Sequence, residues 1–334
     1  MSEDRETYHI LKATCDTVHL GGFSAGLCPV LTVNSGDRIH VETYTGFHQI
    51  DQAPPEFVPT QLREICQNLP NDRKVGSGPH LLTGPIYVRD ALPSDVLEVR
   101  IDRIIPKLPV GFNIMRPGAG ALPQRFSQER VQFVDLNLTE MTAEFPSGSG
   151  IHIPLTPFFG ILGTATDELS RNSIPPGDYG GNMDNRQLQA GSRLFLPVFL
   201  PGAMFSIGDG HSAQGDGEVN LTAIETSMDG VIQLIVHKNW TALPLPFAET
   251  KTDWITMGFA PTLDQAFEQA LTQMITFLEK FIGLDAEEAY TLCSFAVHFH
   301  ITQVVNSPNR GVHGLLPKSI LPKSLYQLVF DRLS

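Results

Sequence analysis

Short runs of alternating apolar and polar residues recur between residues 8 and 245, and turn residues separate them. The clearest run is Val-Leu-Glu-Val-Arg-Ile at 96–101, whose period of two places every second side chain on one face of a strand. The chain has 29 glycines and 25 prolines but only 18% charged residues, so turns are expected to be frequent. This pattern predicts a β-rich fold.

Two pairs of these runs predict β-hairpins. The first pair, 30–33 and 38–43, flanks the turn sequence Asn-Ser-Gly-Asp. In the second pair, 219–225 and 230–236, the predicted turn is Met228-Asp229-Gly230, whose glycine begins the second run. Asp-Gly between alternating runs is a strong short-range hairpin signal. Both pairs therefore favour antiparallel pairing of neighbouring strands.

The pattern changes after Pro261. Residues 262–278 place apolar side chains at helical spacing, with Thr262 available to cap the helix and Gly283 available to end it. Residues 285–295 predict a second helix. We therefore expect a mainly β (α+β) protein, in which an antiparallel, sandwich-like β body is followed by a C-terminal helical pair. The predicted organisation is a single domain (1–334) with a β body at 8–245 and a helix-containing portion at 261–330.

Charge and cysteine content exclude several classes of protein. The formal net charge is −13, from 36 acidic and 23 basic residues, and this argues against a nucleic-acid partner because phosphate binding needs clustered Lys and Arg. The four cysteines form no C-x-x-C pair, so we expect a reducing, cytoplasmic location. We find no signal peptide and no apolar run of about 18 residues, so we expect no membrane partner.

The stretch 206–218 (Ser-Ile-Gly-Asp-Gly-His-Ser-Ala-Gln-Gly-Asp-Gly-Glu) concentrates groups that bind divalent metals. Its carboxylates (Asp209, Asp216 and Glu218) and the His211 imidazole are typical ligands, and its glycines allow positive φ or close approach. Asp209 and His211 are two residues apart and share a face if that piece is extended. We interpret the stretch as a metal-bearing catalytic segment.

Other residues could complete this site. A second glycine-rich stretch, 175–184, ends in Asn182 and Asp184, and His80 is a further imidazole that could be either a ligand or a structural histidine. Structural alternatives exist for the rest: Asp209 could form an Asx turn, and Asp184 could form a surface ion pair. The predicted metal ligands are His80, Asp184, Asp209 and His211.

These segments resemble the acetamidase/formamidase family, in one order from about residue 15 to about residue 320. The strongest matches are Gly-Gly-Asn-Met-Asp (180–184), Leu-Phe-Leu-Pro-Val (194–198) and the run at 208–218, with further matches at 29–37, 80–88, 154–160, 302–306, 311–313 and 316–319. The resemblance implies a homo-oligomer that acts on a small amide. One departure is His298-Phe299-His300, since members of the family usually carry an acid before Thr-Gln-Val-Val.

The resemblance implies a metal-dependent amidohydrolase that cleaves formamide or acetamide to a carboxylate and ammonia. A bound metal polarises the amide carbonyl and lowers the pKa of its water. The candidate general base is Glu218 or Glu168, and Asn182 and Gln214 are candidates to orient the substrate amide or to bond loop backbone. Imidazole favours zinc, while the acid-rich ligand set leaves Ca²⁺ or Mg²⁺ open.

Two other functions fit the same residues. The scaffold could serve a hydrolase of larger or cyclic amides, because fold and centre do not determine the substrate pocket. Alternatively, the chain could be a non-catalytic, calcium-stabilised β-rich binding protein in which the acidic segment is structural. Each residue also has a structural alternative of its own: Glu218, which precedes an apolar run, could begin a solvated strand, and His211 could bond to loop backbone.

Overall fold

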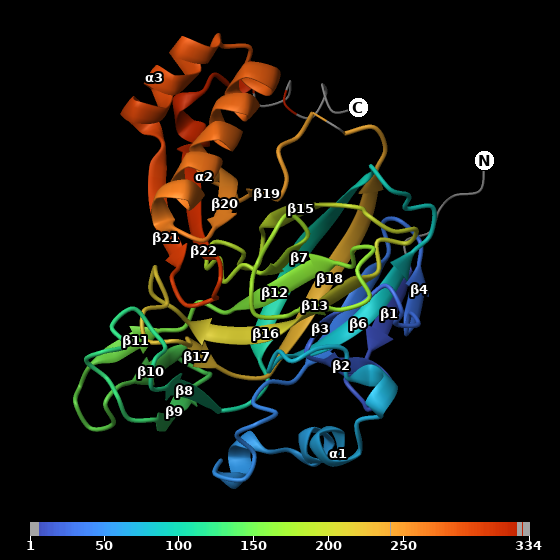
Figure 1. Ribbon diagram of the computed structural model, residues 1–334, viewed down its shortest axis with the longest axis vertical. Coiled ribbons are helices and arrows are strands. Elements are labelled where there is room, and N and C mark those ends of the chain that lie inside the picture. Colours follow the sequence, from blue (N-terminus) through green and yellow to red (C-terminus); the bar gives the residue numbers. More distant parts are fainter. Residues whose placement is uncertain (1–6, 241, 326–328, 330–334) are drawn as a thin grey trace.

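Two large β-sheets packed face to face form the body of the protein (Figure 1). This arrangement is seen in a computed structural model, which describes residues 7–240, 242–325 and 329. The prediction of a mainly β, sandwich-like fold with C-terminal helices is confirmed. Within the described residues, no helix combines the length and the apolar content needed to cross a membrane.

The first sheet has nine strands among the described residues, and only β1 and β5 are parallel neighbours in it. Its order across the sheet is β1 (Tyr8–Leu11), β5 (Arg38–Thr43), β18 (Met228–His237), β7 (Val96–Pro106), β15 (Arg193–Pro197), β19 (Phe247–Glu249), β20 (Asp253–Ala260), β22 (Arg310–Pro317) and β21 (His298–Gln303). The C-terminal helices pack against the strands β20 and β22 of this sheet (Figure 1).

The second sheet is organised around β16 (Phe205–Ala213). One edge of β16 pairs with β12 (Phe158–Thr164), and the other edge pairs first with β6 (Leu81–Val88) and then with β17 (Ile224–Glu225). The remaining strands of this sheet are β2 (Val18–Leu20), β4 (Leu31–Val33), β8 (Val110–Met115), β9 (Arg130–Asn137), β10 (Thr142–Glu144), β11 (His152–Pro154) and β14 (Gly180–Asn182). A separate ribbon pairs β3 (Gly22–Phe23) with β13 (Arg171–Asn172).

The strand β16 is unusual because it carries ionisable side chains although it is completely buried in the body of the protein. Apolar side chains from both sheets meet in the core between the sheets, including Ile39, Val99 and Ile232 from the first and Phe158 and Phe205 from the second. All nine residues of β16 are buried, although the strand carries acidic and imidazole side chains. Burying such groups is costly unless they are paired or bind a metal, so β16 carries polar groups whose burial needs a compensating partner.

Both predicted hairpins are wrong. The strands β4 and β5 do form, but β4 runs parallel to β6 in the second sheet, whereas β5 pairs with β1 and β18 in the first. Asp229-Gly230 lies inside β18 rather than in a turn. A Cβ at position 230 would lie 2.8 Å from the Phe159 ring of the opposite sheet, so this glycine makes room for core packing. Packing between the sheets therefore overrides the local turn signals.

The two C-terminal helices form as predicted. In α2 (Leu263–Phe277), the Thr262 side chain accepts a hydrogen bond from the Gln265 N–H, and the apolar face packs on Trp254. A short π-helix (Leu278–Ile282) follows and ends at Gly283, whose φ is 88°. Asp285 forms a capping box that starts α3 (Ala286–Ala296). Other helical segments are α1 (Thr60–Asn68) and the 3₁₀ turns Pro55–Phe57, Asn71–Arg73 and Lys318–Ile320.

Candidate active site

A buried cluster of one imidazole and four carboxylates lies where β12, β16 and β17 adjoin. His211 is at its centre, with Nε2 3.2 Å from Asp209 Oδ2, 3.2 Å from Glu225 Oε1 and 3.8 Å from Asp184 Oδ1. Glu218 is the fourth acid, and all five residues are buried. Alternation along β16 places Asp209 and His211 on one face, while the other three acids come from different segments.

The five side chains form two overlapping triads that share His211. One triad is Asp184, His211 and Glu218, and the other is Asp209, His211 and Glu225. In each triad the potential ligand atoms all lie within 4.8 Å of one another. Oxygen and imidazole nitrogen donors at this spacing are suited to a divalent cation such as zinc.

Buried polar atoms without partners support this fit. Asp184 Oδ1, Glu218 Oε2 and Glu225 Oε2 are buried and accept no hydrogen bond from the described residues. Buried carboxylate oxygens are nearly always hydrogen-bonded or bound to a cation, because an unpaired one loses its hydration without compensation. Gly160 on β12 leaves space beside Asp184 and Asp209, where any larger residue would intrude. The residues present therefore fit a bound divalent metal.

Gln214 determines which nitrogen of His211 faces the carboxylates. Its Nε2 donates to the backbone oxygen of Asp184 at 2.9 Å, so its Oε1 is turned toward His211 Nδ1, 2.8 Å away. An amide oxygen only accepts, so His211 must donate from Nδ1. In the neutral imidazole, Nε2 then presents its lone pair to the cluster, as a metal ligand requires.

The cluster shifts the pKa of each of its members. Burial raises the pKa of Asp184 to about 6 and that of Glu225 to about 7, and burial together with Asp184 raises the pKa of Glu218 well above its usual value. Burial opposes ionisation of Asp209, but the positive charge of His211 and the hydrogen bond from its ring outweigh burial and lower the pKa of Asp209 to about 2. Burial also opposes a charged His211, yet Glu225 and Asp209 raise its pKa well above 6.5. Protons are therefore held where a cation would bind.

Backbone strain marks the same residues. Asp184, Asp209 and Glu218 adopt left-handed backbone conformations, with φ of 49°, 59° and 46°. Such values are uncommon for residues other than glycine and persist where the surrounding structure enforces them, often at functional sites. Three of the four acids are thus held in conformations that local preference alone would not select.

A cavity of about 160 Å³ opens against one side of the cluster. Asp209 and Glu225 line it, together with His80, whose Nδ1 is 2.7 Å from the Ser173 hydroxyl. His80 therefore reaches the cavity, although it is not in either triad of the described residues. Burial lowers the pKa of His80, so its imidazole is neutral near neutral pH. His80 as a metal ligand stays a prediction, and its place in the cavity wall also suits contact with a small substrate.

Three other predicted site residues have different surroundings. Glu168 pairs with Arg171, its side chain is 49% exposed, and it does not line the cavity, so the structure does not support it as the general base. The Asn182 amide donates to the Ile174 backbone oxygen. The Gln214 amide hydrogen-bonds to the His211 ring and to the Asp184 backbone oxygen. The last two hold the site together instead of facing the cavity.

Sequence reasoning missed two residues of the site. Glu225 was part of a predicted strand, and nothing in its local sequence marks it as a ligand. Asn306 lines the cavity and donates hydrogen bonds to the Asp184 carboxylate and to the Asn182 backbone oxygen. Its position in the 302–306 motif was the available signal, but a lone asparagine after an apolar run indicates no particular chemistry.

The departure at His298-Phe299-His300 lies beside the site. His298 is exposed, whereas His300 Nδ1 is 2.9 Å from Asp216 Oδ2, and Arg186 approaches the other oxygen of Asp216. Asp216 itself is in neither triad. His300 therefore tethers the segment that precedes Glu218, and neither histidine belongs to the two triads.

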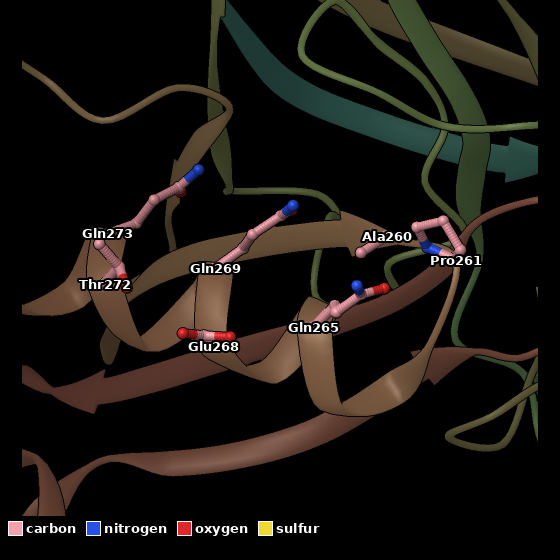
Figure 2. Close-up of a pocket in the computed structure, with 7 residues that line it drawn as sticks. All are labelled: Ala260, Pro261, Gln265, Glu268, Gln269, Thr272 and Gln273. Atoms are coloured by element: carbon pink, nitrogen blue, oxygen red, sulfur yellow. The ribbon is translucent and has the colours of Figure 1, made fainter.

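Another hollow, of about 500 Å³, lies along α2 and holds no such cluster. Figure 2 shows Gln265, Gln269 and Gln273 on the side of the helix next to β20. Gln269 accepts a hydrogen bond from the Phe259 N–H at 3.0 Å. Gln273 likewise accepts from the Met257 N–H, so these two amides satisfy the part of β20 that extends beyond its pairing with β19, and we assign this hollow a structural origin.

Replacing Gln214 with leucine is expected to weaken metal binding by about 10- to 100-fold, the usual effect of losing a group that orients a ligand. The substitution retains all five acid and imidazole side chains but removes the acceptor that holds the His211 proton on Nδ1. Competition with a chelating dye measures the dissociation constant. Gln132→Leu on β9 is a control with the same change of side chain, and equal affinities for both variants would contradict the role of Gln214.

Metal-induced stabilisation should increase as pH rises from about 5 to about 8. Asp184, Glu218, Glu225 and His211 have raised pKa values in the folded chain, so the metal-free fold binds more protons than the unfolded chain and loses stability as pH rises. Asp209 is shifted in the opposite direction, but its change falls below this range. Calorimetry with and without metal measures the gap in Tm, and a gap that narrows with pH would contradict the prediction.

Comparisons with known proteins show which family the chain resembles. The acetamidase/formamidase family model matches residues 167–242 and 258–323. The formamidase of Methylophilus methylotrophus is 30% identical over 249 residues, and the match covers 65% of this chain and 60% of that protein. The chain thus spans less than two thirds of the length of that relative.

Solved structures share nearly the whole fold. A crystal structure of acetamidase from Bacillus halodurans has a TM-score of 0.80 at 28% identity, covering 97% of this chain and 99% of that one. A predicted acetamidase/formamidase from Thermoanaerobacter tengcongensis also has a TM-score of 0.80, at 30% identity, covering 96% and 99%. The chain therefore belongs to the acetamidase/formamidase family, as its motifs predict.

Proposed function

We propose that the protein is a metal-dependent amidohydrolase that cleaves small amides to a carboxylate and ammonia. Relatives named formamidase and acetamidase are amide-hydrolysing enzymes. The observation that carries the proposal is the buried cluster around His211, which has carboxylate oxygens without partners and borders a cavity. Such a cluster would be a large energetic cost in a protein that only needed to fold.

His211, Asp209 and Glu225 are the residues that would hold the metal, with Asp184 beside them. When bound, a divalent metal supplies charge that polarises an amide carbonyl and lowers the pKa of water toward about 7. Zinc suits the mixture of imidazole and carboxylate donors. The negative charge of these acids favours cation binding, and the hydrogen bond to Gln214 keeps the imidazole in the required tautomer.

Glu218 is the proposed general base. Its buried carboxylate belongs to the triad with Asp184 and His211, and it lies behind the two acids that line the cavity, Asp209 and Glu225. A carboxylate with a raised pKa can accept a proton from water and pass it to the departing nitrogen. His80, neutral and facing the cavity, can hydrogen-bond to the substrate amide.

Ammonia release from acetamide and formamide tests the proposal. Protein stripped by a chelator should release none, and adding one equivalent of Zn²⁺ should restore activity. Retained metal-dependent stability without turnover of any amide would instead favour a binding protein. That the chain assembles with copies of itself stays a prediction, which analytical ultracentrifugation would check.

A further inference from the structure

The cavity beside the cluster is larger than the smallest amides require. Its volume of about 160 Å³ is several times the ~30 Å³ that one water molecule occupies in the liquid. Formamide or acetamide would leave much of this space to solvent. The cavity therefore has room for an acyl chain of a few more atoms.

Part of the cavity wall is apolar. Five of its lining side chains are apolar: Phe112, Ile114, Ile174, Leu221 and Val305. None of these side chains can bond to a polar acyl chain, so they suit methylene groups. Leu221 is held with φ at 127°, a backbone conformation that is rare for a leucine and that directs it to this position.

Arg116 supplies the permanent positive charge of this cavity, the one Lys or Arg among its described lining residues. Burial lowers the pKa of His48, the nearby imidazole, and Arg116 lowers it further, so His48 is neutral. Arg116 Nε lies 3.5 Å from Glu129 Oε2, and the two side chains are 44% and 56% exposed. An ion pair this exposed is weak, so the guanidinium is available to a ligand.

The strand β8 sets the distance between the two ends. Phe112 pairs directly with Glu225 of the cluster, and Arg116 follows four residues later, just beyond the end of β8. Four residues of strand span about 13 Å, and the long Arg116 side chain extends from there to the cavity. Glu225 of the cluster and Arg116 thus both line the cavity, and the strand that carries Phe112 and Ile114 runs from one toward the other.

We propose that this enzyme prefers amides whose far end carries a carboxylate, and that Arg116 recognises that carboxylate. The substrate class is the monoamide of a short dicarboxylic acid, such as succinamate. The amide lies at the cluster, the methylene groups contact the apolar walls, and the guanidinium donates to the carboxylate oxygens. This inference rests on the proposed amide hydrolysis and adds the identity of the acyl group.

Succinamate and levulinamide test the proposal, because they share a chain and differ in a terminal carboxylate against a neutral methyl ketone. With zinc-loaded enzyme, kcat/KM for succinamate should exceed that for levulinamide by about tenfold or more, the scale of one charge-assisted hydrogen bond. In Arg116→Gln the ratio should fall to about one, whereas Arg116→Lys should retain part of it. Arg103→Gln, on exposed strand surface, changes the charge equally and should leave the ratio unchanged.

Equal kcat/KM values for the two amides, or a ratio that survives Arg116→Gln, would overturn the proposal while leaving amide hydrolysis intact. Absence of turnover with every amide would refute the proposed function instead. In that case calorimetry can still test recognition by Arg116, by comparing the affinities of the protein for succinate and levulinate. Succinate has a second carboxylate and levulinate does not. Tighter binding of succinate only when Arg116 is present supports recognition by Arg116, and equal affinities refute it.

Discussion

Replacing His211 with asparagine is expected to abolish stoichiometric metal binding and to lower kcat/KM for acetamide by at least about 10³-fold. His211 belongs to both triads, so its loss removes the imidazole from each. The charge stabilisation that a catalytic metal supplies is worth several kcal/mol, and each ~1.4 kcal/mol corresponds to about tenfold in rate. Asparagine retains an N–H that can donate to Gln214 but has no counterpart of Nε2.

Metal content after dialysis, measured by mass spectrometry, and ammonia release are the two readouts for this variant. His313→Asn is the matched control, because His313 is also a buried histidine, bonded at 2.7 Å to the Thr302 hydroxyl and outside both triads. We expect that control to lose some stability but to retain its metal. Full metal occupancy and normal activity in His211→Asn would show that the cluster is not the catalytic centre.

The site could be predicted from sequence where its residues are neighbours in the chain. Asp209 and His211 were recognisable together because alternation on a strand puts both on one face. Glu225 was not, because only the pairing of β17 with β16 brings it to His211. The role of Gln214 was equally hidden, since its two hydrogen bonds depend on where Asp184 lies. Contacts between distant segments are set by tertiary packing, which local pattern does not encode.

The fold, too, could be predicted where the signals are local and could not where distant segments pair. Local signals located the C-terminal helices well, because the Thr262 cap and the Asp285 capping box act within a few residues. Local signals failed at both hairpins, where consecutive strands join different sheets of the sandwich. A turn sequence indicates that the chain changes direction, but it does not determine which strand becomes the neighbour. Which strands pair is determined by the burial of their apolar faces between the two sheets.

Replacing Gly160 with alanine is expected to weaken metal binding at least about 100-fold although no ligand is removed. Gly160 lies on β12, and a Cβ there would be 2.4 Å from Asp184 Oδ1 and 2.6 Å from Asp209 Oδ2. Contacts this short do not persist, so both carboxylates must turn away. The strands need not separate, because the nearest atoms are side-chain oxygens, and the fold should therefore survive.

Circular dichroism and thermal melting of the metal-free Gly160→Ala protein establish that it is folded, and a chelator competition then gives its affinity for Zn²⁺. Gly215→Ala is the control, since a Cβ there would meet no atom within 4 Å and its backbone is not left-handed. Gly160→Ala with wild-type affinity would mean that Asp184 and Asp209 do not hold the cation. A folded variant with empty sites would instead show that the glycine of β12 preserves the space in which the two acids converge.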